Sequence, residues 1–249
     1  RVEIWEEGRG EPEPQYAVIK DLAELSCPFE VAEMPDSLVL QTSEASLTLL
    51  RAPFALVGRR RDGSLFLDTR TEKGLGAYSY INDTFMVSRS RSQDEIILGL
   101  GEKTGPLNRS GRSYMLWNMD VLSPGLLGEL NFDPSTGDPK QDPTSTLFDP
   151  YYISIPFYQS VDAEGRASGS FMDNARRAHY DFGQEGSTEI RFDGGRYVEF
   201  FFAGPKLADV IFEYTELTGR IQPPPLWALG YHHSRCDTYQ QDNVLARAK

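Results

Sequence analysis

The sequence predicts a mainly β protein, folded as an antiparallel β-sandwich, with one helix and the start of an α/β unit near the carboxyl end. Short runs rich in β-branched and aromatic residues recur at close spacing as far as residue 202, which is typical of sandwiches and barrels. Polar and glycine-containing turns separate these runs. The 3.6-residue spacing of apolar side chains that marks a helix begins only after Gly204.

The β runs begin at Ser37, because residues 1–36 carry little pattern. Asp62-Gly63 is a strong hairpin-turn signal, and the arginines at 59–61 beside it are predicted to be exposed to solvent. A second turn, at 193–195, separates the last two runs. The predicted strands are, in chain order, 37–42, 45–51, 54–59, 65–68, 84–88, 96–98, 114–117, 151–159, 169–172, 180–182, 188–192 and 197–202.

The loop between the runs at 96–98 and 114–117 is longer than a hairpin needs, because most hairpin connections take about 2–5 residues. Its glycines alternate with charged and amide side chains, so a solvated connection and a binding loop are both open interpretations. The end of the loop favours binding. Trp117, Asn118 and Asp120 place an aromatic ring, an amide and a carboxylate within four residues, a set that suits sugar hydroxyls.

A second long connection, from 119 to 149, is rich in proline, aromatic and acidic residues. A loop of that length inside a compact domain is either disordered or functional. Its composition favours a loop that packs on a neighbour.

Beyond Gly204 the pattern becomes helical. Pro205 suits a first helical turn and Gly219 suits a C-terminal cap, so the sequence predicts a helix near 205–218. Three prolines at 223–225 end it. The apolar run 226–231 is predicted as a fully buried strand of a parallel sheet, and the chain finishes with a helical segment. The apolar face of the first helix consists of Leu207, Val210, Ile211, Tyr214 and Leu217.

Charge and composition exclude several classes of function. The net charge is −12, with 37 acidic against 25 basic residues, which argues against nucleic acid and anionic membranes as partners. No apolar run approaches the ~20 residues of a membrane-spanning helix, and no signal peptide leads the chain. Two cysteines, Cys27 and Cys236, lie far apart, so a cytoplasmic location is expected, with a single disulfide left open.

Four segments together resemble the glycoside hydrolases of family 31, the retaining α-glucosidases and α-xylosidases. They are GLGEKTGPLNRSGRSYMLWNMD from Gly99, DPYYISIPFYQS from Asp149, GSFMDNARR from Gly169 and LTGRIQPPPLWALGYHHSRC from Leu217. The resemblance implies a galactose mutarotase-like sandwich over 1–204, a connecting helix over 205–222 and the beginning of a (β/α)₈ catalytic barrel over 223–249.

The resemblance also implies what this chain lacks. The family carries its nucleophile and its acid/base carboxylate on later barrel strands, so no catalytic residue is expected here and the chain alone is expected to be inactive. A (β/α)₈ barrel takes roughly 250 residues, far more than follow Pro225. The implied partners are an α-linked oligosaccharide or glucoside substrate and the remainder of the barrel, with no cofactor.

Four substrate-binding residues follow from the resemblance. Asp120 matches the aspartate with which the family's amino-terminal domain bonds sugar hydroxyls, although a turn or capping aspartate is the alternative. His232 and Arg235 follow the first barrel strand at its carboxyl end, where such barrels carry their sites. The family has Trp or Tyr where this sequence has Cys236, so either Tyr239 takes that role or the sugar pocket differs.

Other functions fit the sequence less well. GLGEKTG lacks the spacing of a phosphate-binding loop, and Cys236 with His232 and His233 gives no recognised zinc spacing, so no metal is expected. A stand-alone carbohydrate-binding sandwich remains the alternative, although such a module has no use for the segment PPPLWALGYHHSR. An aldose epimerase would need His and Glu on its sheet, and the β region contains only His179.

Overall fold

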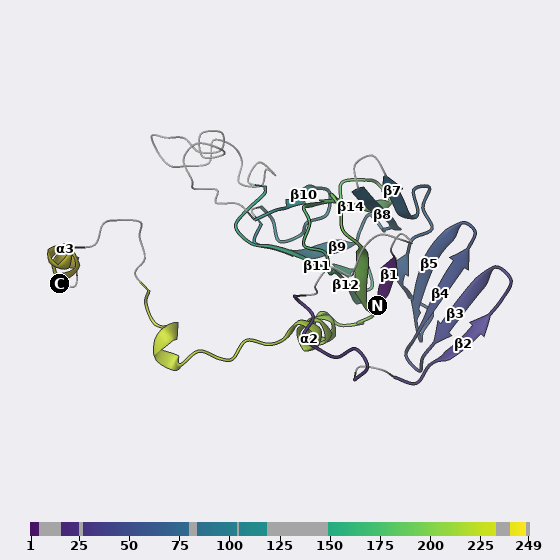
Figure 1. Cartoon of the computed structure of the whole chain (residues 1–249), viewed down its shortest axis with the longest axis horizontal. Coiled ribbons are helices and arrows are strands. Elements are labelled where there is room, and N and C mark those ends of the chain that lie inside the picture. Colours follow the sequence, from purple (N-terminus) through teal and green to yellow (C-terminus); the bar gives the residue numbers. More distant parts are fainter. Residues whose placement is uncertain are drawn as a thin grey trace. The chain divides into compact units, whose positions relative to one another are not determined.

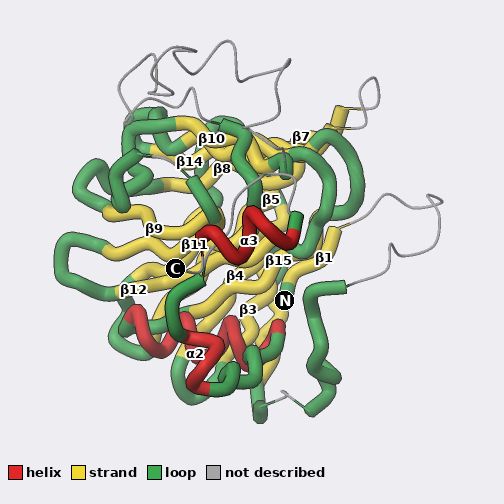
Figure 2. Tube along the Cα trace, turned by 90° about the vertical axis from the view of Figure 1, so that its left-hand side faces the viewer, coloured by secondary structure: helices red, strands yellow, loops and turns green. Residues whose placement is uncertain are grey.

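The structure, a computed structural model, describes residues 1–4, 16–24, 27–79, 84–103, 105–118, 149–232 and 240–247. The chain divides into two compact units, Arg1–Gly219 and Arg220–Lys249. In its described part, the first unit is built from three five-stranded antiparallel sheets and one α-helix (Figure 1). Figure 2 shows how little of this unit is helical. The predicted mainly β fold, an antiparallel sandwich, is therefore confirmed.

Sheet 1 has the strand order β1-β15-β12-β11-β9. Its outer face is covered by α2 (Leu207–Thr218), which confirms the helix predicted near 205–218. Val210 and Leu217 of α2 are buried against aromatic side chains of the sheet, and Tyr214 stacks on Phe157 at 3.9 Å between ring centroids. The strands are β1 (Val2–Ile4), β9 (Ile96–Gly101), β11 (Ser154–Val161), β12 (Ala167–Met172) and β15 (Tyr197–Phe202).

Sheet 2 has the order β10-β13-β14-β8-β7 and packs against the inner face of sheet 1. Alternate side chains of the two sheets form the main core, as period-2 strands with one buried face require. Its fully buried members from these two sheets include Val87, Ile97, Leu100, Tyr180, Ile190 and Phe192, and Leu56 of the third sheet also packs in this core. The strands are β7 (Leu75–Ser79), β8 (Thr84–Ser90), β10 (Ser113–Leu116), β13 (Ala178–Asp181) and β14 (Ser187–Phe192).

Sheet 3 is a meander in which each strand pairs with the next in sequence. The turn between its last two strands is the predicted one. The Asp62 carboxylate accepts hydrogen bonds from the Ser64 amide at 2.9 Å and the Ser64 hydroxyl at 2.6 Å. The strands are β2 (Glu30–Glu33), β3 (Ser37–Gln41), β4 (Ala45–Arg51), β5 (Phe54–Arg60) and β6 (Leu65–Asp68).

Two predicted connections differ from simple hairpins. The turn at 193–195 joins β14 of sheet 2 to β15 of sheet 1, so the chain changes sheets there. The long loop after β9 does the same, because β9 pairs with β11 in sheet 1 and β10 pairs with β13 in sheet 2. Both connections therefore cross between the packed sheets, one in a short turn and the other in a long loop.

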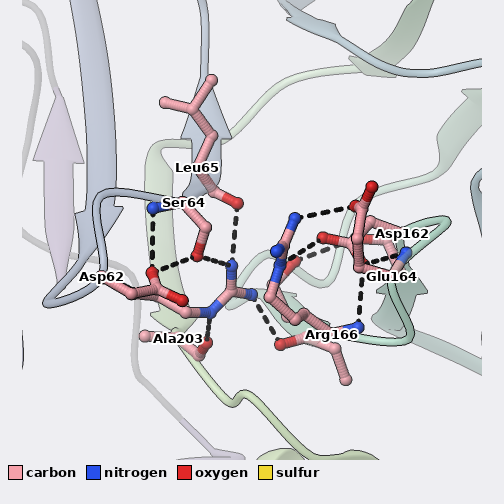
Figure 3. A network of polar contacts seen from close by, with 11 residues as sticks. Asp62, Ser64, Leu65, Asp162, Glu164, Arg166 and Ala203 are labelled. Atoms are coloured by element: carbon pink, nitrogen blue, oxygen red, sulfur yellow. Dashed lines mark hydrogen bonds and ion pairs between the residues drawn. The ribbon is translucent and has the colours of Figure 1, made fainter.

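The predicted exposure of the arginines at 59–61 is wrong for Arg60, which is buried. It lies at the end of β5, where its Nε donates to the carbonyl of Ala203 at 2.5 Å and Nη2 donates to that of Ala167 at 2.7 Å. Nη1 donates to the Leu65 carbonyl at 2.9 Å and to the Ser64 hydroxyl at 3.2 Å. Figure 3 shows these acceptors, beside a second network in which Arg166 pairs with Asp162 and Glu164. Arg60 thereby joins sheet 3 to sheet 1.

Replacing Arg60 with methionine should lower the free energy of unfolding by about 1–3 kcal/mol, because partly buried carbonyls lose their donors. The measurement is urea denaturation of the chain. The matched control is Arg59→Met, since Arg59 is the next residue, is exposed and donates only to the turn carbonyl of Gly63 among the described contacts. Equal midpoints for the two variants would contradict a bridging role for Arg60.

The strand predicted over 226–231, in the second unit, is wrong. Residues Leu226–Leu229 form a 3₁₀ helix, η2, rather than a strand, and Leu226, Trp227 and Tyr231 are more than four-fifths exposed. A strand needs a neighbour for its backbone groups, and among the described residues of 220–249 there is none. Gln241–Arg247 form α3, so the helical end is confirmed. Within the described ranges, none of the helices combines the length and apolar character needed to cross a bilayer.

Candidate functional site

The loop that follows β9 is exposed over most of its described residues, but side-chain contacts anchor it at two points. The Asn108 side-chain oxygen accepts hydrogen bonds from the amides of Ile97 at 3.1 Å and Ser110 at 3.0 Å. Arg109 is buried over the Tyr114 ring, 5.5 Å from its centroid. These amide and guanidinium groups hold the loop against the end of the sandwich. The described part of the loop is thus largely exposed, as the interpretation as a solvated connection predicts, and it is fixed at Asn108 and Arg109.

Glycine is needed where this loop begins. Gly101 has a φ of 78°, and a Cβ there would lie 2.5 Å from the carbonyl oxygen of Ile153. Only glycine combines the left-handed backbone with so close an approach. The strand that precedes the loop and the strand that follows residue 149 are thereby brought into direct contact.

The end of β10 is tied to the start of β11. Trp117 donates its amide to the Ser154 hydroxyl at 3.1 Å, and the Asn118 side-chain oxygen accepts the Ser154 amide at 2.7 Å. Asn118 is therefore a structural support. The indole of Trp117 is half-exposed. Asp120, two residues further on, lies outside the described residues.

Trp117 and Asn118 stand at the rim of a groove of about 1320 Å³ in the first unit. The groove also receives side chains from the ends of β12 and β15 and from α2. Its lining combines aromatic surface with charged and amide groups, the composition of sites that orient polar ligands. Among the lining residues are Trp117, Asn118, Phe171, Asp173, Arg176 and Tyr214.

Asp173 is the least satisfied charged group of this groove. Its Oδ2 is buried and has no hydrogen-bond partner among the described residues. Burial raises the pKa of the Asp173 carboxyl, against the opposing influence of Arg1. The neighbouring Asn174 is held by the carbonyls of Gly194 at 3.1 Å and Arg196 at 2.9 Å. An incoming hydrogen-bond donor would therefore meet a carboxylate on a firmly held turn. The sequence indicated this segment only through its family resemblance.

Of the four predicted substrate-binding residues, His232 is the one that lies among the described residues. His232 belongs to the second unit and is exposed, with its Nε2 2.6 Å from the carbonyl oxygen of Ala228. Arg235 and Tyr239 lie outside the described residues, as Asp120 does. Among the described residues there is no group of three or more His, Cys, Asp and Glu side chains that could hold a metal ion.

Comparison with known proteins gives a consistent result. Residues 1–181 match the model of the glycosyl hydrolase 31 N-terminal galactose mutarotase-like domain. An alpha-glucosidase 2 from Bacillus thermoamyloliquefaciens is 33% identical over 93% of this chain and 27% of its own length. An alpha-glucosidase from Saccharolobus solfataricus is 35% identical over 64% of this chain and 20% of its own length. The chain thus spans about a quarter of these relatives or less.

A solved structure agrees with the sequence relatives. A family 31 dextranase from Flavobacterium johnsoniae, crystallised as a D412A mutant with isomaltotriose, superposes with a TM-score of 0.71 and 28% identity. The superposition covers 90% of this chain and 25% of the dextranase chain. The three-sheet sandwich is therefore the fold found at one end of a much longer hydrolase. The chain belongs to the family of glycosyl hydrolase 31 N-terminal galactose mutarotase-like domains.

Proposed function

We propose that the complete protein is a retaining α-glucosidase-like hydrolase of α-linked glucosides, in which this chain supplies the amino-terminal sandwich. The observation that carries the proposal is the 33% identity with an alpha-glucosidase along 93% of the chain. The dextranase complexed with isomaltotriose supports an α-linked glucoside as the substrate class. An alpha-xylosidase from Lactiplantibacillus pentosus is 28% identical, and Cys236 replaces the aromatic residue of the family, so glucosides and xylosides are both to be assayed.

The chain's contribution in this proposal is to position substrate. Asp120 bonds sugar hydroxyls through its carboxylate, which accepts stronger hydrogen bonds than a neutral group. Asp120 follows Asn118 by two residues in the sequence. Asn118 is itself fixed to β11. The backbone is therefore fixed at Asn118, two residues before the proposed contact residue in the sequence.

The second unit contributes the other proposed contacts. His232, Arg235 and Tyr239 follow the 3₁₀ helix that enters the barrel region in this proposal. Their charged and aromatic groups suit a sugar ring and its hydroxyls. The remainder of the catalytic barrel is the proposed partner of both units and supplies the reacting carboxylates.

The isolated chain should release no sugar from 4-nitrophenyl α-D-glucoside, whereas the complete protein should release it steadily. Retaining hydrolysis needs a nucleophile and an acid/base carboxylate about 5–5.5 Å apart, and the proposal assigns both to the barrel. The measurement is release of 4-nitrophenol by the repurified chain and by the complete protein. Turnover by the chain alone would contradict the assignment. A complete protein inactive on both α-glucosides and α-xylosides would overturn the proposed function.

A further inference from the structure

The inner face of sheet 1 changes from apolar to polar along two neighbouring strands. On β11, Tyr158 packs in the main core and Ser160 follows two residues later. On β12, Met172 packs in the same core, and Ser170 and Ser168 precede it at the same spacing. Side chains two residues apart point to the same face of a strand. Hydroxyl groups therefore stand on a face that elsewhere forms the core.

These hydroxyls line a cleft of about 340 Å³ to which all three sheets contribute, here called the three-sheet cleft. Sheet 1 contributes the serines and Phe201. Sheet 2 contributes Arg89, and sheet 3 contributes Arg60 and Phe66. No described residue lines both this cleft and the groove beside Trp117. The volume lies at the lower end of the range of about 300–1,000 Å³ for small-molecule sites, so it suits a ligand as small as a mono- or disaccharide.

The cleft has guanidinium donors that the protein does not fully use. Only 7% of the Arg89 side chain is exposed, and its Nη atoms donate to the Tyr158 hydroxyl at 2.7 Å and to Glu199. Its Nε has no hydrogen-bond partner among the described residues, and the same holds for Nε of Arg91, which also lines the cleft. Buried donors are normally satisfied in folded proteins. The cleft therefore holds donor capacity beyond what the fold consumes.

Carboxylates and hydroxyls supply acceptors in the same cleft. The hydroxyls of Ser160 and Ser168 lie 2.9 Å apart, and the Ser160 hydroxyl donates to the Glu95 carboxylate. A hydroxyl has one proton, so Ser160 accepts from Ser168. Burial raises the pKa of the Glu95 carboxyl, the Ser160 hydrogen bond lowers it, and the charge of Asp162 adds to the rise. Figure 3 shows Asp162 paired with Arg166 on the hairpin beside the cleft.

This mixture of charges favours a neutral ligand rich in hydroxyl groups. An anion would meet Glu95 and Asp162, and a cation would meet the arginines, so neither is matched by the whole lining. A sugar hydroxyl both donates and accepts, so it can bond a guanidinium through its oxygen and a carboxylate through its proton. Phe66 and Phe201 are partly buried lining residues. Their rings offer apolar surface to the C–H groups of a sugar ring.

We propose that the three-sheet cleft is a binding site for a neutral mono- or disaccharide, held by Glu95, by the hydroxyls of Ser160 and Ser168 and by the arginines. The inference goes beyond the proposed function and does not depend on it, because the cleft is formed by described residues of the first unit alone. The site binds its sugar without transforming it.

A titration of the chain with maltose, followed by ligand-observed NMR, tests the site. Binding should be saturable with a Kd in the millimolar range or tighter. Ser168→Leu should weaken it about tenfold or more, because the larger side chain fills the cleft and removes a hydroxyl. The matched control is Ser187→Leu, since Ser187 is also a partly buried strand serine but lines neither cavity. The control should leave the Kd unchanged.

A conservative variant separates recognition from packing, and it carries the test if Ser168→Leu does not fold. Glu95→Gln keeps the size of the side chain and removes its charge, so the Kd for maltose should rise about tenfold while the melting temperature hardly changes. Glu189→Gln is the control, since Glu189 is a partly buried carboxylate that lines neither cavity. Maltose binding that survives both Ser168→Leu and Glu95→Gln would overturn the proposal, as would the absence of saturable binding to the wild type.

Inorganic phosphate tests the choice of a neutral ligand. At about 10 mM it should not displace maltose, and the Kd for maltose should change by less than about twofold between low and high salt, because screening weakens only charged ligands. Saturable binding of phosphate, with displacement of maltose, would show that the cleft is an anion site and would overturn the proposal.

Hydrogen exchange on the complete protein keeps this proposal apart from the proposed function. A thio-linked maltose analogue, which resists hydrolysis, should slow exchange in the hairpin 160–168, and Glu95→Gln should abolish this protection. The amides of β4 should keep their rates. Protection in a protein that hydrolyses no α-glucoside or α-xyloside would support the cleft and overturn the proposed function. An active enzyme without protection at 160–168 would overturn the cleft alone.

Discussion

Replacing Arg89 with methionine should lower the free energy of unfolding by about 3–5 kcal/mol, because it leaves a buried carboxylate without its cation. Arg89 lies on β8 of sheet 2 and pairs with Glu199 on β15 of sheet 1, where Glu199 is fully buried. Burial by itself lowers the pKa of Arg89, but the Glu199 charge, together with Tyr158 and Tyr197, outweighs burial, and the pKa is raised. Glu199 also accepts from the hydroxyls of Ser170 and Tyr197. The pair thus crosses the core between the two sheets.

Thermal and urea denaturation of the chain measure this effect. For a domain of this size the melting temperature should fall by roughly 6–20 °C. Arg89→Met with Glu199→Leu should regain most of the loss, because no charge stays buried. The control is Arg70→Met, since Arg70 pairs with Asp68 at 2.6 Å on the surface and should change stability by less than about 1 kcal/mol. An Arg89→Met variant as stable as the control would show that the pair does not hold the sheets together.

Replacing Asp120 with alanine should lower kcat/KM of the complete protein at least tenfold. Losing a charge-assisted hydrogen bond costs about 1.5–3 kcal/mol, which corresponds to roughly one to two powers of ten in rate. Asp120→Asn keeps the shape and weakens the bond, so its kcat/KM should lie between those of the wild type and the alanine variant. The melting temperature should hardly change, because a ligand-facing carboxylate supports little of the core.

The measurement is steady-state hydrolysis of an α-glucoside, with the melting temperature recorded on the same preparations. Asp133→Ala offers a control within the same segment 119–148, and it should keep kcat/KM within about twofold of the wild type. The role proposed for Asp120 fails if Asp120→Ala unfolds the domain while the surviving fraction keeps normal activity. In that case the aspartate is a structural cap.

Local patterns were enough to predict most strands. The runs at 45–51, 65–68 and 197–202 are strands with the predicted bounds, because alternating or continuous apolar residues and turn residues act over a few positions. The strands β1, β2 and β7 were not predicted. All four residues of β2 are exposed, so the sequence has no alternating apolar face that would predict this strand. The strand β1 has only three residues, and its partner lies almost 200 positions away in the sequence.

Burial of charge and choice of partner could not be predicted in the same way. Nothing in the neighbourhood of Arg60, Arg89 or Glu199 distinguishes them from exposed charges, since their partners come from distant strands. The run 226–231 is as apolar as a buried strand. Whether such a run becomes a strand depends on a pairing strand elsewhere in the protein, and local sequence does not show whether one is present. The residues of the candidate site divide in the same way, into those that local sequence indicates and those that depend on distant contacts. Trp117 and Asn118 were identified from composition, whereas Asp173 owes its importance to contacts across the fold.

The pairing of β1 with β15 has a consequence for how the protein is made. Val2 lies opposite Glu199 and Ile4 opposite Tyr197, so β1 pairs with a strand that is synthesised almost 200 residues later. At about 5–20 residues per second, the intervening chain takes roughly 10–40 s to synthesise. Sheet 3 pairs neighbour with neighbour and can form within that interval. Sheet 1 cannot close before residue 202 has emerged, so β1 is synthesised well before the strand on which it docks.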